Sequence, residues 1–192
     1  MEKLILASGS PRRFQLLTQA SIPFEAFPAD VDESYDRSLS PADVVQVLSQ
    51  RKAKIVASQF PRRVILAADT VVALQNKILE KPHTAENAKR MLLSLSGQSH
   101  HVLTGITLAK NEVSYTEYVS TKVTFRTLSI QEIDTYIATG EPLDKAGAYG
   151  VQEKACIFVE RIEGDYYNVV GLPLCRVYRL LSEKYPWILS QR

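Results

Sequence analysis

The chain has 192 residues, and 23 basic against 21 acidic residues give it a formal net charge of +2. Hydrophobic residues make up 45% and charged residues 23%, which is typical of a folded globular protein and excludes an intrinsically disordered one. The balanced charge argues against a nucleic-acid partner, but it allows a local cluster of cations that binds a small anion. The length suits a single domain over residues 1–192 with a substantial core.

No apolar run is long enough to cross a membrane, and the N-terminus lacks the apolar segment of a signal peptide. Cys156 and Cys175 have no metal-ligand spacing and suggest no disulfide framework. We therefore expect a cytoplasmic protein without a membrane partner.

Predicted helices and strands are mixed along the chain. Lys3 to Ala7 is a short buried strand, and Ser10 with Pro11 is typical of a helix start. Apolar spacing and capping residues predict further helices from 40, from 84, from 129 to 140, and over 173–184. Strands are predicted over 63–68, 77–80, 101–109 and 113–125, and a hairpin with arms 156–162 and 166–170. This pattern indicates a mixed α/β (α+β) fold.

Arg12 and Arg13 lie where the first helix begins, although a cation there is unfavourable by roughly 0.3–1 kcal/mol. The small residues of 8–10 precede them. A helix N-terminus, its backbone amides and two guanidinium groups together favour phosphate. The alternative is that both side chains point into solvent, and the motif alone does not decide between the two.

Lys52 and Asp69 also break local rules. Lys52 falls within the apolar stripe of the second predicted helix, so it needs an anionic partner unless its stem runs along the apolar surface to water. Asp69 is predicted to end a buried strand, where a carboxylate could bind a cation, deprotonate water, or simply cap the next turn.

Three further features fit the same chemistry. Glu33 could be a second carboxylate, Lys81 offers another phosphate-binding cation, and segment 144–150 contains two glycines that allow close approach of a ligand. Each also has an ordinary structural explanation. Cations for phosphate plus carboxylates for a metal are the minimum for metal-assisted hydrolysis of a phosphate compound.

At these residues the sequence resembles the Maf family of nucleotide pyrophosphatases, over nearly the whole chain. Together the matching segments are highly specific. They are Leu6 to Arg13, Lys52-Ala53, Ala68-Asp69-Thr70, Lys81-Pro82, Leu95-Ser96-Gly97 with His100, Asp144 to Gly150, and Gly171-Leu172-Pro173.

The resemblance implies a fold related to the inosine triphosphatases, with a mixed twisted sheet and two lobes around a deep central cleft. It implies that water attacks the α-phosphate of a nucleoside triphosphate with the help of a divalent cation, which could be manganese, magnesium or cobalt. Asp69 would be the proton acceptor and would bind the metal with Glu33. The triphosphate would be held by Ser8, Arg12, Arg13, Lys52 and Lys81.

Three positions of the family pattern mark base specificity, and here they are Arg12, Thr70 and Gln152. They resemble the branch that acts on dTTP and UTP. The Gln152 amide offers a donor and an acceptor, which matches the imide edge of uracil or thymine. Such an enzyme would remove excess or modified pyrimidine nucleotides.

Two alternatives stay open. A 7-methyl-GTP pyrophosphatase would keep the chemistry, but that branch typically has tryptophan in place of Arg12. A protein that influences septum formation by binding alone would have little use for carboxylates beside phosphate-directed cations. A homodimer is compatible with the family, but no residue gives independent evidence for it.

Overall fold

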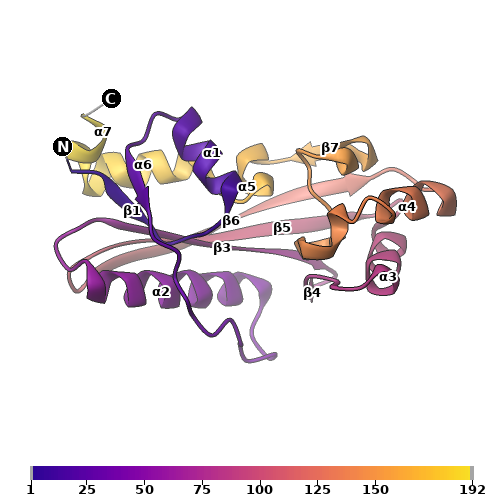
Figure 1. Ribbon diagram of the computed structural model, residues 1–192, viewed down its shortest axis with the longest axis horizontal. Helices are drawn as coiled ribbons and strands as arrows, with labels where there is room; N and C mark the ends of the chain where they lie inside the picture. The colour runs from indigo at the N-terminus through magenta and orange to yellow at the C-terminus, as the bar shows by residue number, and fades with distance from the viewer. Residues whose placement is uncertain (1, 191–192) are drawn as a thin grey trace. The chain divides into compact units, whose positions relative to one another are not determined.

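The computed structural model describes residues 2–190, which form a seven-stranded mixed sheet with helices (Figure 1). This confirms the predicted mixed α/β class. The strands are β1 (Leu4–Leu6), β2 (Phe24–Ala26), β3 (Ile65–Leu74), β4 (Lys77–Leu79), β5 (Ser99–Lys110), β6 (Val113–Phe125) and β7 (Val159–Glu163). The α-helices are α1 (Pro11–Gln19), α2 (Pro41–Gln59), α3 (Ala85–Leu95), α4 (Ile130–Ile137), α5 (Tyr166–Val170), α6 (Leu174–Lys184) and α7 (Pro186–Leu189). Short 3-10 helices are η1 (Glu141–Asp144), η2 (Ala146–Ala148) and η3 (Lys154–Phe158).

The sheet has the strand order β2-β1-β3-β5-β6-β7, with β4 paired to β3. β1 is parallel to β2 and β3, whereas β4 and β7 are antiparallel to their partners. In the described part of the chain, no helix has the length and apolar character needed to span a membrane.

The chain forms two compact units. The first unit consists of the residues up to Asp69, Thr104–Val119 and those from Gly171 onward, and the second unit of Thr70–Leu103 and Ser120–Val170. Strands β3, β5 and β6 contribute residues to both units. The description as one domain with two lobes around a cleft stays a prediction.

In the first unit, α2 covers one face of the strands, and α1 and α6 cover the other (Figure 1). The start of α2 follows from its sequence, because the Ser40 hydroxyl accepts the Asp43 amide and Pro41 opens the first turn. Val56 of α2 is fully buried in a cluster with Ile5 of β1 and Ile65 of β3. This packing fixes the face of α2 that carries Lys52.

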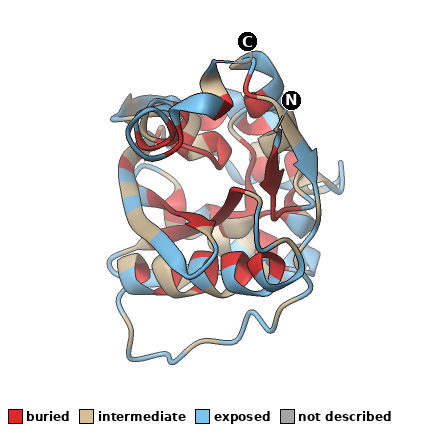
Figure 2. Cartoon of the chain, turned by 90° about the vertical axis from the view of Figure 1, so that its left-hand side faces the viewer, coloured by how far each residue is buried: buried red, intermediate tan, exposed pale blue. Residues whose placement is uncertain are grey.

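The second unit has its own core of aliphatic and aromatic side chains. Leu92 of α3, Ile133 of α4 and Phe125 of β6 are all buried in one cluster. The predicted capping box of α4 is confirmed, because the Ser129 hydroxyl accepts the Glu132 amide and the Glu132 carboxylate accepts the Ser129 amide. Figure 2 shows buried residues along the strands and on one side of the longer helices.

One predicted strand boundary is wrong. The strand predicted over 63–68 is β3, which continues through Asp69 and Thr70 to Leu74. Asp69 is therefore an interior residue of the strand and does not end it. A short polar pair such as Asp-Thr often ends a strand, but the apolar residues that follow extend this buried strand.

The hairpin predicted from 156 to 170 is also wrong. Its first arm begins as η3 and becomes β7 only at Val159, and its second arm is the helix α5. The chain does turn at Gly164, but the Asp165 carboxylate then accepts the amides of Tyr167 and Asn168. This N-cap outweighs the strand preference of the tyrosines and valines that follow.

A buried histidine in the second unit makes stability depend on pH. The His100 side chain is in an edge-to-face contact with Phe125, and its Nε2 lies 2.8 Å from the Tyr149 hydroxyl. Burial, helped by the neighbouring His101, lowers the pKa of His100 to about 4. Since an unfolded histidine titrates near 6.5, the unfolded chain binds more protons between these two pH values.

The stability that neutral His100 provides is therefore complete above pH 6.5 and lost as the pH falls toward 4. We expect the wild-type protein to lose ~2 kcal/mol more than His100→Gln between pH 7 and pH 5. Glutamine retains a polar atom near the position of Nε2 but does not titrate. Urea denaturation of both proteins at the two pH values measures the difference, and equal losses would contradict the account.

Candidate functional site

The turn from β1 into α1 orients Arg13 beside Ser8. Arg13 donates from Nη1 to the Ser8 hydroxyl at 3.0 Å and from Nε to the Gly171 carbonyl at 2.9 Å. The Ser8 hydroxyl also accepts the Ser10 amide, at 3.2 Å. The Ser10 side chain makes no capping hydrogen bond to α1, and the first turn contains no acidic residue. The N-terminus of α1, which is the positive end of the helix dipole, therefore also carries Arg12 and Arg13. This combination favours an anionic ligand.

Lys52 joins two carboxylates in the first unit. Its Nζ lies 2.6 Å from Asp69 Oδ1 and 2.7 Å from Glu33 Oε1. The side chains of Lys52 and Asp69 are each 11% exposed, whereas Glu33 is 62% exposed. The predicted anionic partner of Lys52 is therefore present, and the alternative that its ammonium reaches open water is wrong. Lys54, two residues further along α2, is exposed.

Sequence reasoning missed Arg51, which holds the segment that carries Glu33. Its Nη1 donates to the backbone carbonyls of Asp32 and Ser34, the second at 2.8 Å. These two carbonyls flank Glu33. The contact with Arg51 therefore holds the Glu33 carboxylate near Lys52, the next residue of α2. The only signal in the sequence was that Arg51 adjoins Lys52.

Electrostatic interactions link the β1–α1 turn to the two carboxylates. Burial lowers the pKa of Arg13, while Asp69 and Glu33 raise it and the neighbouring Arg12 lowers it further. Arg12 is half-buried. The first unit thus gathers the six predicted residues Ser8, Arg12, Arg13, Glu33, Lys52 and Asp69. Three cations and two carboxylates leave a net positive charge, which suits a polyanionic ligand.

The other predicted residues, Thr70, Lys81 and Gln152, belong to the second unit. Thr70 follows Asp69 on β3 and is half-buried, while Lys81 and Gln152 are exposed. Lys81 lies on the segment between β4 and α3. The roles predicted for these three residues rest on the sequence.

Glu33 and Asp69 could supply two of the oxygen ligands of a hard divalent cation, but not a complete ligand set. Both are oxygen donors, and each has one oxygen within hydrogen-bonding distance of Lys52 Nζ. Among residues 2–190, no group of three or more histidine, cysteine, aspartate or glutamate side chains could hold a metal. Magnesium is commonly bound by one or two carboxylates and completes its coordination with substrate phosphates and water. The two carboxylates match that mode and would not form a closed protein cage.

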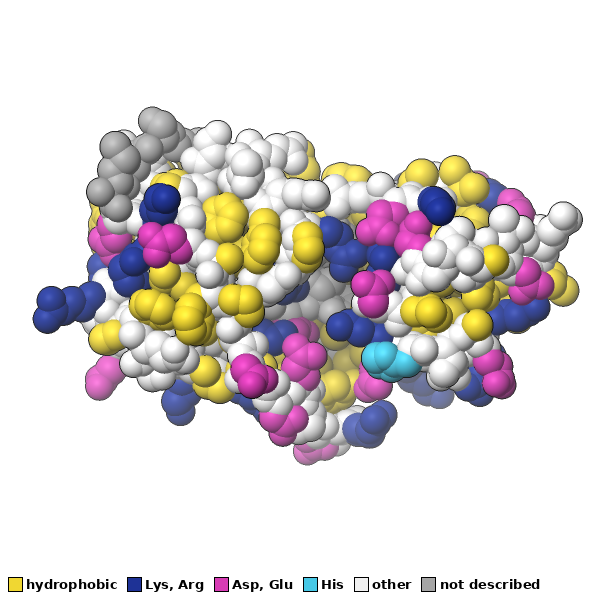
Figure 3. Space-filling view, viewed as in Figure 1, with side chains coloured by type: hydrophobic (Ala, Val, Ile, Leu, Met, Phe, Trp, Pro, Cys, Tyr) yellow, Lys and Arg dark blue, Asp and Glu magenta, His cyan; other side chains and the backbone are white. Residues whose placement is uncertain are grey.

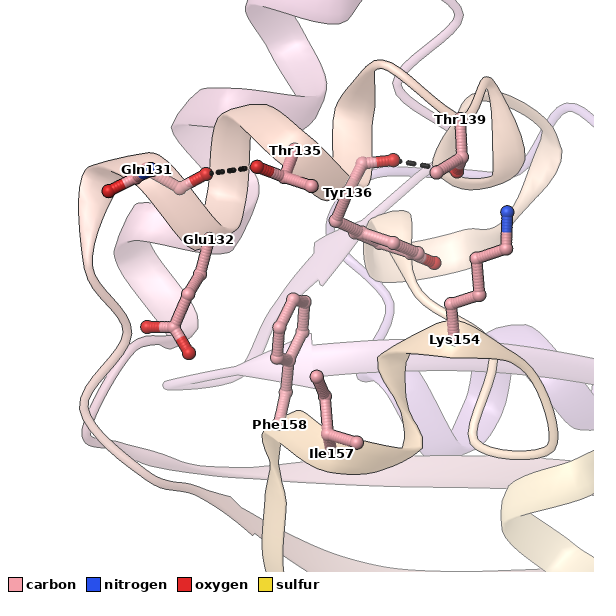
Figure 4. Close-up of a pocket in the computed structure, with 8 residues that line it drawn as sticks. All are labelled: Gln131, Glu132, Thr135, Tyr136, Thr139, Lys154, Ile157 and Phe158. Atoms are coloured by element: carbon pink, nitrogen blue, oxygen red, sulfur yellow. Dashed lines mark hydrogen bonds between the residues drawn. The ribbon is translucent and has the colours of Figure 1, made fainter.

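A separate cavity lies in the second unit, between α4 and η3, with a volume of about 320 Å³ (Figure 4). Tyr136, Ile157 and Phe158 contribute to a mainly apolar lining, and none of the predicted site residues takes part. A nucleotide's phosphates need cations and backbone amides, so this cavity is not the expected triphosphate site.

Charged side chains of both signs are interspersed over the face of the molecule shown in Figure 3.

The Lys52–Asp69 pair leads to a prediction about stability. Lys52→Met keeps an apolar stem but leaves the buried Asp69 carboxylate without its ammonium partner, which we expect to cost about 3 kcal/mol of unfolding free energy. The exposed pair with Glu33 contributes little to this cost. Urea denaturation measures the loss. The matched control Lys54→Met, on the same helix, should change stability by less than ~0.5 kcal/mol. Equal effects of the two substitutions would contradict the role of the pair.

Comparison with known proteins identifies the family. Residues 3–184 match the family model described as Maf-like protein. The chain is 51% identical to a protein of Bacillus cytotoxicus named dTTP/UTP pyrophosphatase, over 95% of this chain and 96% of that protein. A Geobacillus protein of the same name is 52% identical over 93% of this chain and 96% of its own length. A Bacillus cereus protein, again of that name, is 49% identical over 95% and 96%. The chain therefore belongs to the Maf family.

Proposed function

We propose that this protein hydrolyses dTTP and UTP to the nucleoside monophosphate and pyrophosphate. The observation that carries the proposal is the pairing of Lys52 with Asp69 and Glu33, at 2.6 and 2.7 Å, in the unit that also contains the Arg13–Ser8 hydrogen bond. The names of relatives that are about half identical over nearly the whole chain support the substrate class.

Phosphate binding is assigned to the β1–α1 turn and to Lys52. The N-terminus of α1 offers a positive dipole, and Arg12 and Arg13 offer guanidinium groups that can bind phosphate oxygens in bidentate fashion. Ser8 would orient Arg13 through their 3.0 Å hydrogen bond. Lys81 is proposed as a further phosphate-binding cation.

Asp69 is proposed as the proton acceptor. A water oxygen attacks the α-phosphorus, the bond from the α-phosphorus to the α–β bridging oxygen breaks, and pyrophosphate leaves. The proton of the water passes to the Asp69 carboxylate. Lys52 fixes that carboxylate in place, and the burial of both side chains keeps competing water away from them.

A divalent cation, manganese, magnesium or cobalt, is part of the proposal, with Glu33 and Asp69 as its protein ligands. When bound, such an ion withdraws charge from phosphate oxygens and stabilises the charge that develops on the leaving group. Oxygen ligands discriminate only modestly among these three metals.

We assign base selection to Arg12, Thr70 and Gln152. The Gln152 amide is proposed to form hydrogen bonds with the imide edge of the pyrimidine. Removal of excess or modified pyrimidine nucleotides is the proposed cellular task. We place it in the cytoplasm, where nucleoside triphosphates are used. Ordinary and modified nucleotides share the imide edge, so both are proposed substrates.

The test is pyrophosphate release from a panel of nucleoside triphosphates with magnesium or manganese, for the wild type and Asp69→Asn. We expect release from dTTP and UTP, and a loss of at least about 100-fold in kcat for the variant, because it lacks the general base. Asp134→Asn, which alters an exposed ion pair with Lys89, is the matched control and should retain activity.

Release from 7-methyl-GTP in place of dTTP and UTP would keep the chemistry and overturn the base assignment. Near wild-type turnover by Asp69→Asn would remove its role as proton acceptor. No release from any nucleotide would favour a protein that acts by binding.

A further inference from the structure

Lys145 is a buried lysine in the second unit for which the proposed reaction has no use. The residue is only 7% exposed, and its Nζ makes three contacts. The ammonium lies 3.0 Å from Glu153 Oε2 and 3.1 Å from Asp144 Oδ1, and it donates to the Glu141 carbonyl at 2.8 Å. Burying an ammonium group carries a desolvation cost that only good partners offset, so this arrangement has a structural task.

The contacts of Lys145 join the two ends of the loop 141–153. Gln152 is the second-last residue of this loop. Lys145 joins the start of the loop, at Glu141, to its end, at Glu153. A side-chain carbon on Gly150 would lie 3.0 Å from Lys145 Cε, so the lysine stem packs directly on the backbone there. The Glu153 amide in turn donates to the Gly150 carbonyl at 3.1 Å. The backbone on both sides of Gln152 therefore rests on Lys145.

A second set of contacts, made by Glu141, joins the same loop to α4. The Tyr136 hydroxyl donates to Glu141 Oε1 at 2.9 Å, and Glu141 Oε2 lies 3.4 Å from the Lys154 amide. Glu141 thus contacts both α4 and the residue after Glu153. These contacts hold the two ends of the loop independently of the Lys145 ammonium.

The loop also contacts the segments that carry Thr70 and Lys81. Gly147, at a φ of +67°, packs against β3 so closely that a side-chain carbon would meet the Val72 side chain at 2.8 Å. Val72 follows Thr70 by two residues on that strand. The Gly147 amide donates to the carbonyl of Glu80, the residue before Lys81, at 3.4 Å. The loop therefore contacts residues next to Thr70 and Lys81 and itself contains Gln152, the three predicted substrate-binding residues of the second unit.

We propose that Lys145 is a positioning residue for base recognition, which fixes the loop 141–153 and through it the Gln152 amide. The inference rests on the proposed function, since it requires a pyrimidine nucleotide as the substrate. Lys145 contacts no reacting atom in this account. Its ammonium restrains the end of the loop so that one orientation of Gln152 is retained.

The test compares Lys145→Met with the wild type in the full-length protein. Methionine keeps the apolar stem that packs on Gly150 and removes only the ammonium. We expect KM for dTTP and UTP to rise by about 3-fold to 10-fold, the change in binding that the loss of one neutral hydrogen bond to the base causes. The preference for dTTP over dCTP should fall with it, because dCTP lacks the imide edge, while kcat for dTTP changes by less than about threefold.

Two further variants separate positioning from general stability. Glu153→Gln breaks the same ion pair from the other side and should reproduce the loss of preference, and the double variant should be no worse than either single one. Lys154→Met is the matched control, because this lysine adjoins Glu153 in the chain and is exposed. Circular dichroism and urea denaturation report whether each variant folds.

A folded Lys145→Met protein with wild-type KM and wild-type preference for dTTP over dCTP would overturn the inference. An equal fall in kcat on all substrates, with the preference unchanged, would also overturn it. If Lys145→Met does not fold, Glu153→Gln provides the same test. A wild-type protein that releases no pyrophosphate would instead refute the proposed function, so the two failures are distinguishable.

Discussion

The first unit of this protein depends on one buried ammonium group. Lys52 enters an apolar helix face, where its charge is costly, and the cost is offset because Asp69 and Glu33 lie within 2.7 Å of its Nζ. The same contact prevents the buried Asp69 carboxylate from being an isolated charge. Helix α2, strand β3 and the segment before α2 are thus tied together by charge. The Lys52 ammonium thus holds both carboxylates close together.

Much of the first unit could be predicted because its unusual residues break local rules. A cation pair at a helix start and a lysine in an apolar stripe are visible in the sequence without any structure. In the structure, that lysine pairs with Asp69 and Glu33, and Arg13 donates a hydrogen bond to Ser8. The roles of these residues in binding and catalysis stay predictions.

The misses have physical causes as well. Asp69 was expected to end a strand because a short polar pair commonly does so, yet the following valines continue β3. A local cap, the Asp165 carboxylate, overrides strand propensity and turns a predicted strand arm into α5. The contacts of Arg51 and Lys145 could not be predicted, because their partners are backbone carbonyls or residues on the far side of a loop. Such contacts leave no periodic signal in a sequence.

If water attacks the α-phosphorus, the oxygen of that water must appear in the nucleoside monophosphate. Wild-type protein should hydrolyse dTTP in ¹⁸O-labelled water in a single turnover, and the products should be analysed by mass spectrometry. Attack at the α-phosphorus puts one labelled oxygen in the monophosphate and none in pyrophosphate. Label in pyrophosphate would place the attack at the β-phosphorus, and label in inorganic phosphate would indicate stepwise removal of phosphates. Either result would contradict the account.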